Sequence, residues 1–385
     1  MRDLFLLDPE VCFLNHGSYG ACPAEVFAAY QHWQRQLEWQ PVAFMAPKHL
    51  AALNRGVRQA LAAELGVAPE DLVGMVNATE ALNIVLLGLD LKPGDEIVTT
   101  DHEYAAMDKT LAVLCARTGA RVRQVTVPLP LASETAFTDT VVGAFTPRTR
   151  VLFLSHITSP TALRLPLERA VAEARARGIL TVIDGAHGPG QGALDLGTIG
   201  ADAYAGNCHK WLLAPKGAAL LHVRPEHQAG ILPRVFSHGW EQDGSAPFGD
   251  SAFLDRLEFQ GTRDRAAWFA VPAALEFRQA HDWDAVIAGC SALVTSTAER
   301  IAALSGYPLL SSVEFRAPQM VTLELPPGDT AALHDRLLDE FGIEIPVVDW
   351  AGRRFVRLSV QGYTTQADCD RLVAALGAVF GWSKD

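Results

Sequence analysis

Long apolar runs, paired cysteines and basic clusters are all missing from this sequence. No apolar stretch approaches the roughly 20 residues that cross a bilayer, and the opening MRDLFLLDPE places acids where a signal peptide carries basic residues. The 6 cysteines form no CxxC pair, which argues against a zinc site or a disulfide framework. A net charge of -12, without a run of Lys or Arg, argues against nucleic acid and membranes as partners. We therefore expect a cytoplasmic protein with reduced cysteines and no bound metal.

The chain is long enough to form two domains of unequal size. It has 385 residues, of which 49% are hydrophobic and 20% are charged, so it can bury a large core. Apolar strand-like runs alternate with amphipathic helical patterns from 73 to 223, which is typical of a parallel sheet covered by helices. We expect an N-terminal arm over residues 1–22, a large domain over 23–265 and a small α+β domain over 266–385.

The same patterns predict individual elements. One helix is expected over 47–65, and the strands of the large domain over 73–76, 96–100, 121–127, 151–154, 179–183, 203–206 and 218–223. A polar connection is expected between 127 and 151, and a long loop rich in Gly, Ser and aromatic residues over 233–263. In the small domain we expect helices over 265–280, 283–304, 330–341 and 365–380, and strands over 320–325, 343–348 and 355–360.

The stretch from 181 to 217 carries the strongest chemical signal. An apolar run stops on Asp184, Gly-rich turns follow, and Lys210 stands between His209 and Trp211. A pyridoxal phosphate site needs an acid at the carboxyl end of a buried strand, which keeps the pyridine nitrogen protonated, and a lysine that forms a Schiff base with the aldehyde. Here the two are 26 positions apart (210 − 184). The alternative is an ordinary solvated lysine in a turn.

Two further clusters fall at the same edge of the predicted sheet. A strand enters a helix through Asn77 and Thr79, and the free N–H groups of such a helix start suit a phosphate, although an ordinary N-cap fits as well. His102 and Tyr104 follow the next strand. Because ligands bind beyond the carboxyl ends of parallel strands, this pair is expected on the same rim as Asp184.

Eight segments together resemble the class V aminotransferase-fold enzymes, and among them the isopenicillin N epimerase-like group, which includes C–S lyases of ergothioneine synthesis. The segments are FLNHGSYG, NATEALN, TDHEYAAM, SHITSP, VIDGAHGPG, GNCHKWLLAPKG, FQGTRD and VRLSVQGY, in the expected order between positions 13 and 363. The resemblance implies a pyridoxal phosphate-dependent transferase fold of type I. Such a fold has a large α/β/α domain with a mostly parallel sheet and a smaller α+β domain.

The resemblance also implies which residues hold the cofactor. Lys210 would be the Schiff-base lysine, Asp184 would bind the pyridinium nitrogen, and His187 would lie near the ring hydroxyl. The phosphate would be held by four residues of the same chain: Ala78, Thr79, Asn207 and His209. Thr262 would reach the phosphate of a neighbouring subunit, because class V sites lie at the interface of a homodimer.

Other residues are implied on the substrate side. Arg357 would bind the α-carboxylate of an amino acid, a task that suits the planar guanidinium fork. The alternation of Val356, Leu358 and Val360 places Arg357 on the opposite face of its strand, although a surface arginine is the alternative. His102 or Tyr104 would stack on or border the ring, and three residues of the arm would close over the substrate: Asn15, His16 and Gly17.

The expected chemistry begins with removal of the Cα proton by Lys210. Three outcomes then branch: return of a proton on the opposite face, loss of a β-leaving group as in C–S lysis, or transamination. The first two need a proton donor, and both Tyr104 and His102 are candidates. The sequence does not choose among the three, or name the amino acid.

Two other functions have less support. A cysteine desulfurase needs a mobile nucleophilic cysteine late in the chain, whereas Cys290 and Cys369 fall in helical patterns and Cys208 in a turn. A non-enzymatic α/β binding protein, in which Lys210 is an ordinary loop residue, is the remaining alternative. The segment DGAHGPGQG lacks the GxGxxG spacing of a dinucleotide site.

Overall fold

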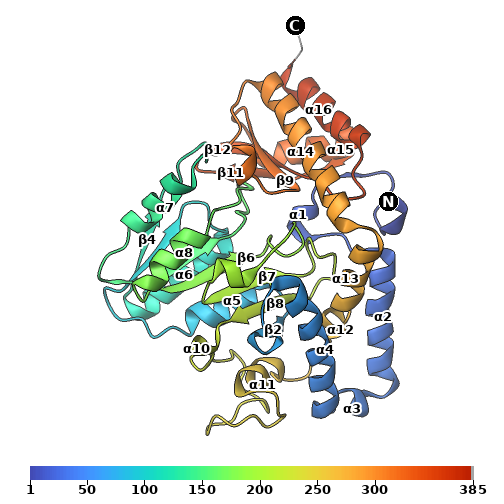
Figure 1. Cartoon of the computed structure of the whole chain (residues 1–385). Helices are drawn as coiled ribbons and strands as arrows, with labels where there is room; N and C mark the ends of the chain where they lie inside the picture. The colour runs from blue at the N-terminus through green and yellow to red at the C-terminus, as the bar shows by residue number, and fades with distance from the viewer. Residues whose placement is uncertain (383–385) are drawn as a thin grey trace.

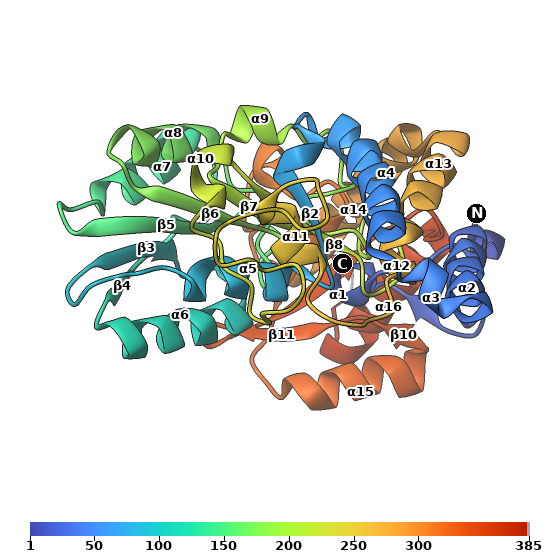
Figure 2. The ribbon, with the colours of Figure 1, turned by 90° about the horizontal axis from the view of Figure 1, so that it is seen from below.

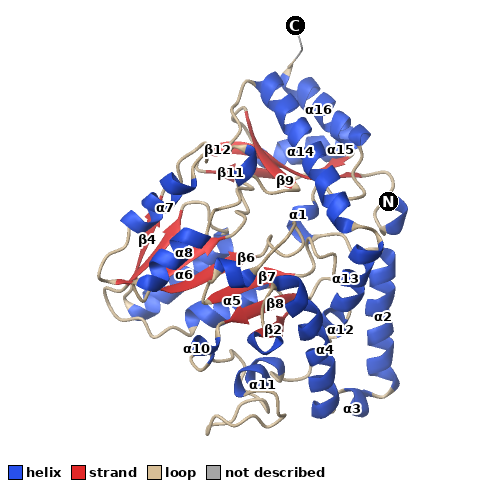
Figure 3. Cartoon of the chain, viewed as in Figure 1, coloured by secondary structure: helices blue, strands red, loops and turns tan. Residues whose placement is uncertain are grey.

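A seven-stranded sheet forms the centre of the larger part of the molecule (Figures 1 and 3). The computed structural model describes residues 1–382. The strand order is β2-β8-β7-β6-β5-β3-β4, and all strands except β8 run in one direction. β8 returns beside β7 through a short turn, which reverses its direction. The strands are β2 Leu72–Met75, β3 Glu96–Thr100, β4 Arg121–Val125, β5 Thr149–Ser155, β6 Leu180–Gly185, β7 Ala203–Asn207 and β8 Ala219–Val223.

Helices cover both faces of this sheet, as seen edge-on in Figure 2. On one face lie α5 (Ala78–Leu87) and α6 (Ala105–Thr118), which pack with buried strand residues such as Phe153. On the other face lie α4 Pro47–Leu65, α7 Glu134–Gly143, α8 Glu168–Ala176 and α13 Val271–Ala280, which pack with residues such as Leu154. Because both faces are buried, inner strands such as β5 are apolar at successive positions, whereas the edge strand β4 is polar and largely exposed. The structure confirms the expected α/β fold with a mostly parallel sheet.

The smaller part of the chain is a three-stranded antiparallel sheet with three long helices (Figure 1, orange to red). Its strands are β9 Met320–Leu325, β11 Val347–Trp350 and β12 Arg353–Ser359, in the order β11-β12-β9. Its helices are α14 Trp283–Ser305, α15 Thr330–Phe341 and α16 Gln366–Phe380. The N-terminal arm joins this part, because β1 (Cys12–Phe13) pairs in parallel with β10 (Ile343–Glu344).

The remaining helices of the described chain are short, with one exception. The exception is α2 (Ala24–Trp39), which begins after Pro23 and packs on α12 and α13. None of the helices in residues 1–382 is both long and apolar enough to cross a membrane. The short helices are α1 His16–Tyr19, α3 Pro41–Phe44, α9 Leu196–Ile199, α10 Pro225–Gln228, α11 Ala252–Glu258 and α12 Ala266–Phe269, with 3-10 turns at Arg2–Leu4, Pro69–Asp71 and Val313–Phe315.

Several helix boundaries agree with the sequence, and local chemistry explains them. The helix expected over 47–65 is α4, which starts at Pro47 and ends where Gly66 adopts a φ of 67°. The amide of Gly66 bonds to the carbonyl of Ala62, so it satisfies a carbonyl group left free at the helix end. α16 begins with a capping box between Thr365 and Asp368.

Two expectations about connecting segments were wrong. The connection expected to be polar between β4 and β5 contains α7, which Ser133 caps and which buries Phe137. The loop expected over 233–263 contains α11, capped by Ser251. Both helices are short, so two to three turns of periodicity did not stand out among turn-forming residues.

Two elements expected to be continuous are divided at prolines. The helix expected over 265–280 breaks at Ala270 into α12 and α13, and Pro272 stands at the start of α13. Proline has no amide hydrogen and fits only the first turn of a helix. Likewise Pro346 separates β10 from β11, where one strand was expected over 343–348. The break lets β10 pair with the arm while β11 pairs with β12.

Candidate active site

A cavity of about 540 Å³ lies at the carboxyl ends of the central strands. Its walls come from the arm, the start of α5, the loop after β3, the ends of β5, β6 and β7, the turn before β8, and β12. In Figure 1 these elements converge around α1, between the large sheet and the small one. Its volume is that of a small-molecule site, at the edge of the sheet where α/β proteins bind ligands.

Lys210 lies in the turn between β7 and β8. Its Nζ is 3.1 Å from Nε2 of His187, and the indole Nε1 of Trp211 donates to Nδ1 of the same ring at 3.2 Å. Burial, followed by the nearby charge of Arg357, lowers the pKa of Lys210 from 10.5 to about 7, although Asp184 opposes the shift. An amine with this pKa can act as a nucleophile and as a base near neutral pH.

Asp184 is the penultimate residue of strand β6 and is only 4% exposed. Its Oδ1 accepts a hydrogen bond of 2.9 Å from the amide of Ala186. Burial raises the pKa of this carboxyl group, while the Ala186 amide and Lys210 act in the opposite direction. A cation bound against it would stabilise the charged form, and the protonated nitrogen of a pyridine ring is such a cation.

The start of α5 is fixed against the end of β7 at the cavity wall. Asn77 caps the helix by accepting from the amide of Glu80 at 2.8 Å, and Oδ1 of Asn207 accepts from the amide of Ala78 at 2.9 Å. Ala78 and Asn207 both line the cavity. The bond leaves the side-chain NH₂ of Asn207 as a donor at the start of a ten-residue helix.

Thr79 and His209 complete this wall of the cavity. Nδ1 of His209 bonds to the carbonyl of Ala218 at 3.2 Å, which leaves Nε2 for a ligand. Burial, followed by the charge of Lys210, lowers the pKa of His209 to about 4, so its ring is neutral near pH 7. A hydroxyl group, an imidazole and a helix start are groups that bind phosphate. The residues present therefore fit a pyridoxal phosphate group, with Lys210 and Asp184 as partners of its ring.

Arg357 is a buried cation with no acid bonded to it among the described residues. It is 5% exposed; its Nη1 donates to the carbonyl and hydroxyl oxygens of Ser159 at 2.7 and 3.1 Å, and its Nη2 to Ser18 Oγ at 3.1 Å. Its Nε has no hydrogen-bond partner in the part of the chain that the structure describes. Burial lowers the pKa of Arg357 to about 10. A guanidinium in this state is a site for a carboxylate.

Tyr104 and His102 are separated by the structure. Tyr104 lines the cavity and is 44% exposed, whereas His102 lies outside it and is fully buried. The His102 ring packs against Trp350 at a tilt of 36° with centroids 4.3 Å apart, and its Nδ1 lies 2.7 Å from the hydroxyl of Thr161. Burial lowers the pKa of His102 to about 4. Of the two residues, only Tyr104 is placed to meet a ligand.

The residues expected from the arm lie at different depths. Gly17 lines the cavity, and its amide donates to Ser359 Oγ at 3.1 Å. His16 lies behind it, fully buried, with Nε2 3.0 Å from the carbonyl oxygen of Lys210. Asn15 points away and donates to Glu344 at 2.8 Å. The arm is thus held both to the turn that carries Lys210 and to the small sheet.

Thr262 does not line the cavity of its own chain. It lies in an exposed turn between α11 and α12. The neighbouring Arg263 lies in a second, narrow pocket with Gly74 and Trp268. A role for Thr262 within the cavity described here would therefore require a second subunit.

Sequence reasoning missed a buried acid and a hydroxyl beside the cavity. Ser155 ends β5 opposite Asp184 in β6, lines the cavity, and donates to Glu103 at 2.6 Å. Glu103 also accepts from Thr100 at 2.7 Å, and burial raises the pKa of its carboxyl group to about 8. Isolated residues of this kind carry no periodic signal, so only their position after a strand could have identified them.

Three more cavity residues were missed, namely Ser18, Ser159 and Lys216. The two serines hold the guanidinium of Arg357, and the Nζ of Lys216 donates to the carbonyl of Gly20 at 2.9 Å. Each of these bonds joins segments far apart in the sequence, so no local sequence pattern predicts them.

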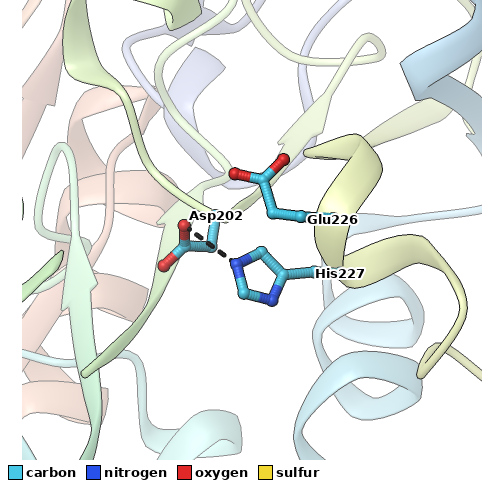
Figure 4. A group of neighbouring side chains, drawn as sticks. All are labelled: Asp202, Glu226 and His227. Carbon is cyan, nitrogen blue, oxygen red and sulfur yellow. Dashed lines mark ion pairs between the residues drawn. The ribbon is translucent and has the colours of Figure 1, made fainter. Parts of the chain in front are cut away.

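A separate group of side chains has the spacing of a metal site. Asp202, Glu226 and His227 offer ligand atoms within 4.8 Å of one another (Figure 4). However, Asp202 pairs with Arg175 at 3.1 Å and with His227 at 3.2 Å, and Glu226 pairs with Arg224 at 2.8 Å. Oxygen atoms that already pair with guanidinium groups make this group an ion-pair network.

The comparison with protein families agrees with this geometry. Residues 20–372 match the family model described as aminotransferase class V, so the chain belongs to that family. It is a pyridoxal phosphate-dependent enzyme with the type I fold. The resemblance that the eight sequence segments carry is thereby confirmed.

Individual relatives point to two kinds of reaction. Isopenicillin N epimerase of Amycolatopsis lactamdurans is 38% identical over 387 residues, which cover 97% of this chain and 96% of that protein. A putative L-cysteine desulfhydrase of Oryza sativa subsp. japonica is 32% identical over 293 residues, or 70% of this chain and 58% of that protein. Among solved structures, a glycine-linked mutant of C-DES superimposes with a TM-score of 0.82 at 23% identity over 98% of both chains, a likeness of fold.

Proposed function

We propose that the protein epimerises an amino-acid centre at Cα, with isopenicillin N or a similar aminoacyl compound as substrate. One observation carries the proposal: the amine of Lys210, the phenol of Tyr104 and the buried guanidinium of Arg357 line the same cavity. The 38% sequence identity to an isopenicillin N epimerase, over almost the whole of both chains, supports it. The cysteine desulfhydrase relatives match at lower identity, 32% or less.

The residues divide the work as follows. Arg357 binds the α-carboxylate of the substrate through its fork, and Asp184 and His187 hold the cofactor ring. When bound, the cofactor supplies an acceptor for the electron pair left at Cα. Lys210 takes the Cα proton as a base, which a pKa of about 7 allows at neutral pH. Tyr104 returns a proton from the other side, which inverts the centre.

The experiment is incubation of the holoenzyme with isopenicillin N in deuterium oxide. We expect the product of inverted configuration, with deuterium at the epimerised carbon. Tyr104→Phe should stop inversion but still exchange the Cα proton of the starting isomer, because Lys210 is intact. Tyr307→Phe, in the small domain outside the cavity, is the matched control. Full inversion by Tyr104→Phe would remove Tyr104 from the mechanism.

The second candidate is β-elimination from a cysteine or a cysteine conjugate. The desulfhydrase relative favours it, and Tyr104 could protonate the departing sulfur atom. With L-cysteine, elimination and hydrolysis give sulfide, pyruvate and ammonia, so release of sulfide and pyruvate without inversion would replace the epimerase proposal. Turnover that depends on an added keto acid would instead indicate an aminotransferase.

A cysteine desulfurase is the weakest variant. None of the 6 cysteines, all within the described residues, lines the cavity. Cys208 is fully buried, and burial raises the pKa of its thiol. A buried thiol with a raised pKa is a poor nucleophile.

The proposed assembly is a cytoplasmic homodimer in which Thr262 of each chain contacts the phosphate in the other. The exposed turn that carries Thr262 is available for such a contact. Light scattering should give twice the mass of one chain, and Thr262→Ala should weaken binding of pyridoxal phosphate. A monomer with undiminished cofactor affinity would contradict the proposal.

A further inference from the structure

Trp211 follows the Schiff-base lysine directly and is fully buried. Its indole Nε1 donates to Nδ1 of His187 at 3.2 Å, and its ring packs against that of His16 with centroids 4.8 Å apart. An indole nitrogen is a donor and never an acceptor. The direction of the bond between Trp211 and His187 is therefore fixed by chemistry.

This direction determines where His187 carries its proton. Burial, with the nearby charge of Lys210 next in size, lowers the pKa of His187 well below its usual value, so the ring is neutral. A neutral imidazole has one N–H group. Because Nδ1 accepts from Trp211, the hydrogen must be on Nε2.

The amine of Lys210 lies on the other side of this ring. Its Nζ is 3.1 Å from Nε2 of His187. Since Nε2 donates, the bond forms only when Nζ accepts, and only the uncharged amine has a lone pair with which to accept, so the bond favours the uncharged form. The same N–H group is available to a cofactor oxygen once the lysine is engaged elsewhere.

We propose that Trp211 is a positioning residue that fixes the tautomer of His187. Through His187 it favours the uncharged form of the Lys210 amine, and it keeps the Nε2–H group of His187 available as a hydrogen-bond donor in the cavity. This inference deepens the proposed function, because it concerns the same lysine. It does not depend on whether the later reaction is epimerisation or elimination. Neither the family membership nor the sequence pattern assigns a role to this side chain.

Other charged and titratable groups face the pair and are unchanged by a substitution of Trp211. Asp184 from β6 and Arg357 from β12 act on Lys210. His209 and His16 act on His187, in addition to Lys210 and Arg357. A difference between the native protein and a Trp211 variant therefore reports on the hydrogen bond that the indole supplies.

The test is the reaction of the apoprotein with pyridoxal phosphate, followed as growth of the yellow absorbance band between about pH 6 and pH 10. In Trp211→Phe, His187 can carry its proton on Nδ1 and accept at Nε2 from a charged Lys210. The charged amine is then stabilised, so the pKa of Lys210 rises. We expect the rate at pH 7 to fall about three- to tenfold and to recover at higher pH. The reason is that a rise of one unit in the pKa of Lys210 lowers the fraction of uncharged amine up to about tenfold.

Trp283→Phe is the matched control. Trp283 is buried at 2% exposure, lies at the start of α14, and its indole N–H has no partner among the described residues. This variant loses the same bulk without losing a hydrogen bond, and its pH profile should match that of the native protein. A second pair separates packing from tautomer: Trp211→Phe should cause no further pH shift in a His187→Ala background.

Nuclear magnetic resonance of histidine-labelled apoprotein gives the direct readout. We expect His187 to carry its proton on Nε2 in the native protein and at least partly on Nδ1 in Trp211→Phe. An Nδ1–H form in the native protein would overturn the proposal. So would equal pH profiles for Trp211→Phe and Trp283→Phe, or a shift that persists without His187. A protein that reacts with cofactor as expected but epimerises nothing would refute only the proposed function.

Discussion

Strand β6 has a buried acid near each of its ends. Near its amino end, Oδ2 of Asp202 accepts from the amide and the hydroxyl of Thr181, both at 2.8 Å, and Oδ1 pairs with Arg175. The same Oδ1 also pairs with His227 (Figure 4). At its carboxyl end, Asp184 accepts one bond from a backbone amide. The Asp202 carboxylate has all its partners within the chain, whereas the Asp184 carboxylate can accept further hydrogen bonds. The functional acid is thus recognised by hydrogen-bonding capacity that its surroundings leave unused.

The largest expected effect comes from removing the amine of Lys210, which lines the same cavity as Asp184. Lys210→Met should lower turnover at least about a thousandfold, because it removes both the nucleophile and the base. The matched control is Lys92→Met, an exposed lysine paired with Asp90 on the surface. Turnover is measured with saturating cofactor. Residual activity within tenfold of the native value would show that another group takes the proton.

Exchanging the two acids for amides tests the comparison itself. Asp184→Asn should lower turnover about a hundredfold or more, because the stabilised cation is lost, and should leave the apoprotein as stable as before. Asp202→Asn should keep turnover but cost about 1–3 kcal/mol of unfolding free energy, because it leaves buried donors and Arg175 without their acceptor. Denaturant unfolding and steady-state kinetics measure both. Equal losses of stability would mean that the two ends of β6 do not differ.

A third prediction concerns Arg357, the buried cation that lines the same cavity as Asp184. Arg357→Lys keeps the charge but loses the fork, and we expect KM for the amino acid to rise about ten- to a hundredfold with a smaller change in kcat. This corresponds to one charge-assisted hydrogen bond of about 1.5–3 kcal/mol. Arg353→Lys, which alters an arginine of the same strand that pairs with Glu324, is the control. Cofactor affinity should be unchanged in both variants.

The last prediction concerns the pH dependence of stability. The pKa of Lys210 falls from 10.5 to about 7, so between these values the unfolded chain binds more protons than the folded one. Lys210 therefore destabilises the apoprotein most below pH 7, and this penalty disappears as the pH rises toward 10.5. Lys210→Met should melt at a higher temperature than the native apoprotein at about pH 6, and the difference should shrink by pH 10. A constant difference would contradict the lowered pKa.

The sequence predicted the large sheet well because each strand is a local apolar run. The strand before Asp184, the turn that carries Lys210 and the helix start at Thr79 each have their own short-range signal, and strand direction then brings them to one edge. The site residues found from these signals line one cavity. Their assigned roles stay predictions that the experiments above address.

What the sequence did not predict depends on contacts between distant segments. His102 and Tyr104 are two positions apart, and only the packing of Trp350 from the small sheet shows that His102 is covered while Tyr104 is open. The two serines that hold Arg357 come from the arm and from the loop after β5. The periodicity of apolar residues does not predict such a contact, because the contact is determined by tertiary packing.

The pairing of the arm with β10 also constrains how the protein is made. Cys12 lies opposite Ile343, so 331 residues (343 − 12) must be added before this strand has its partner. At about 5–20 residues per second, that takes roughly 15 to 70 s. The ribosome-bound chain can finish its large sheet during this interval, but it cannot place Gly17 and Ser18 in the site. Competence for catalysis therefore arrives only after Ile343 has been added, well after the last strand of the large sheet.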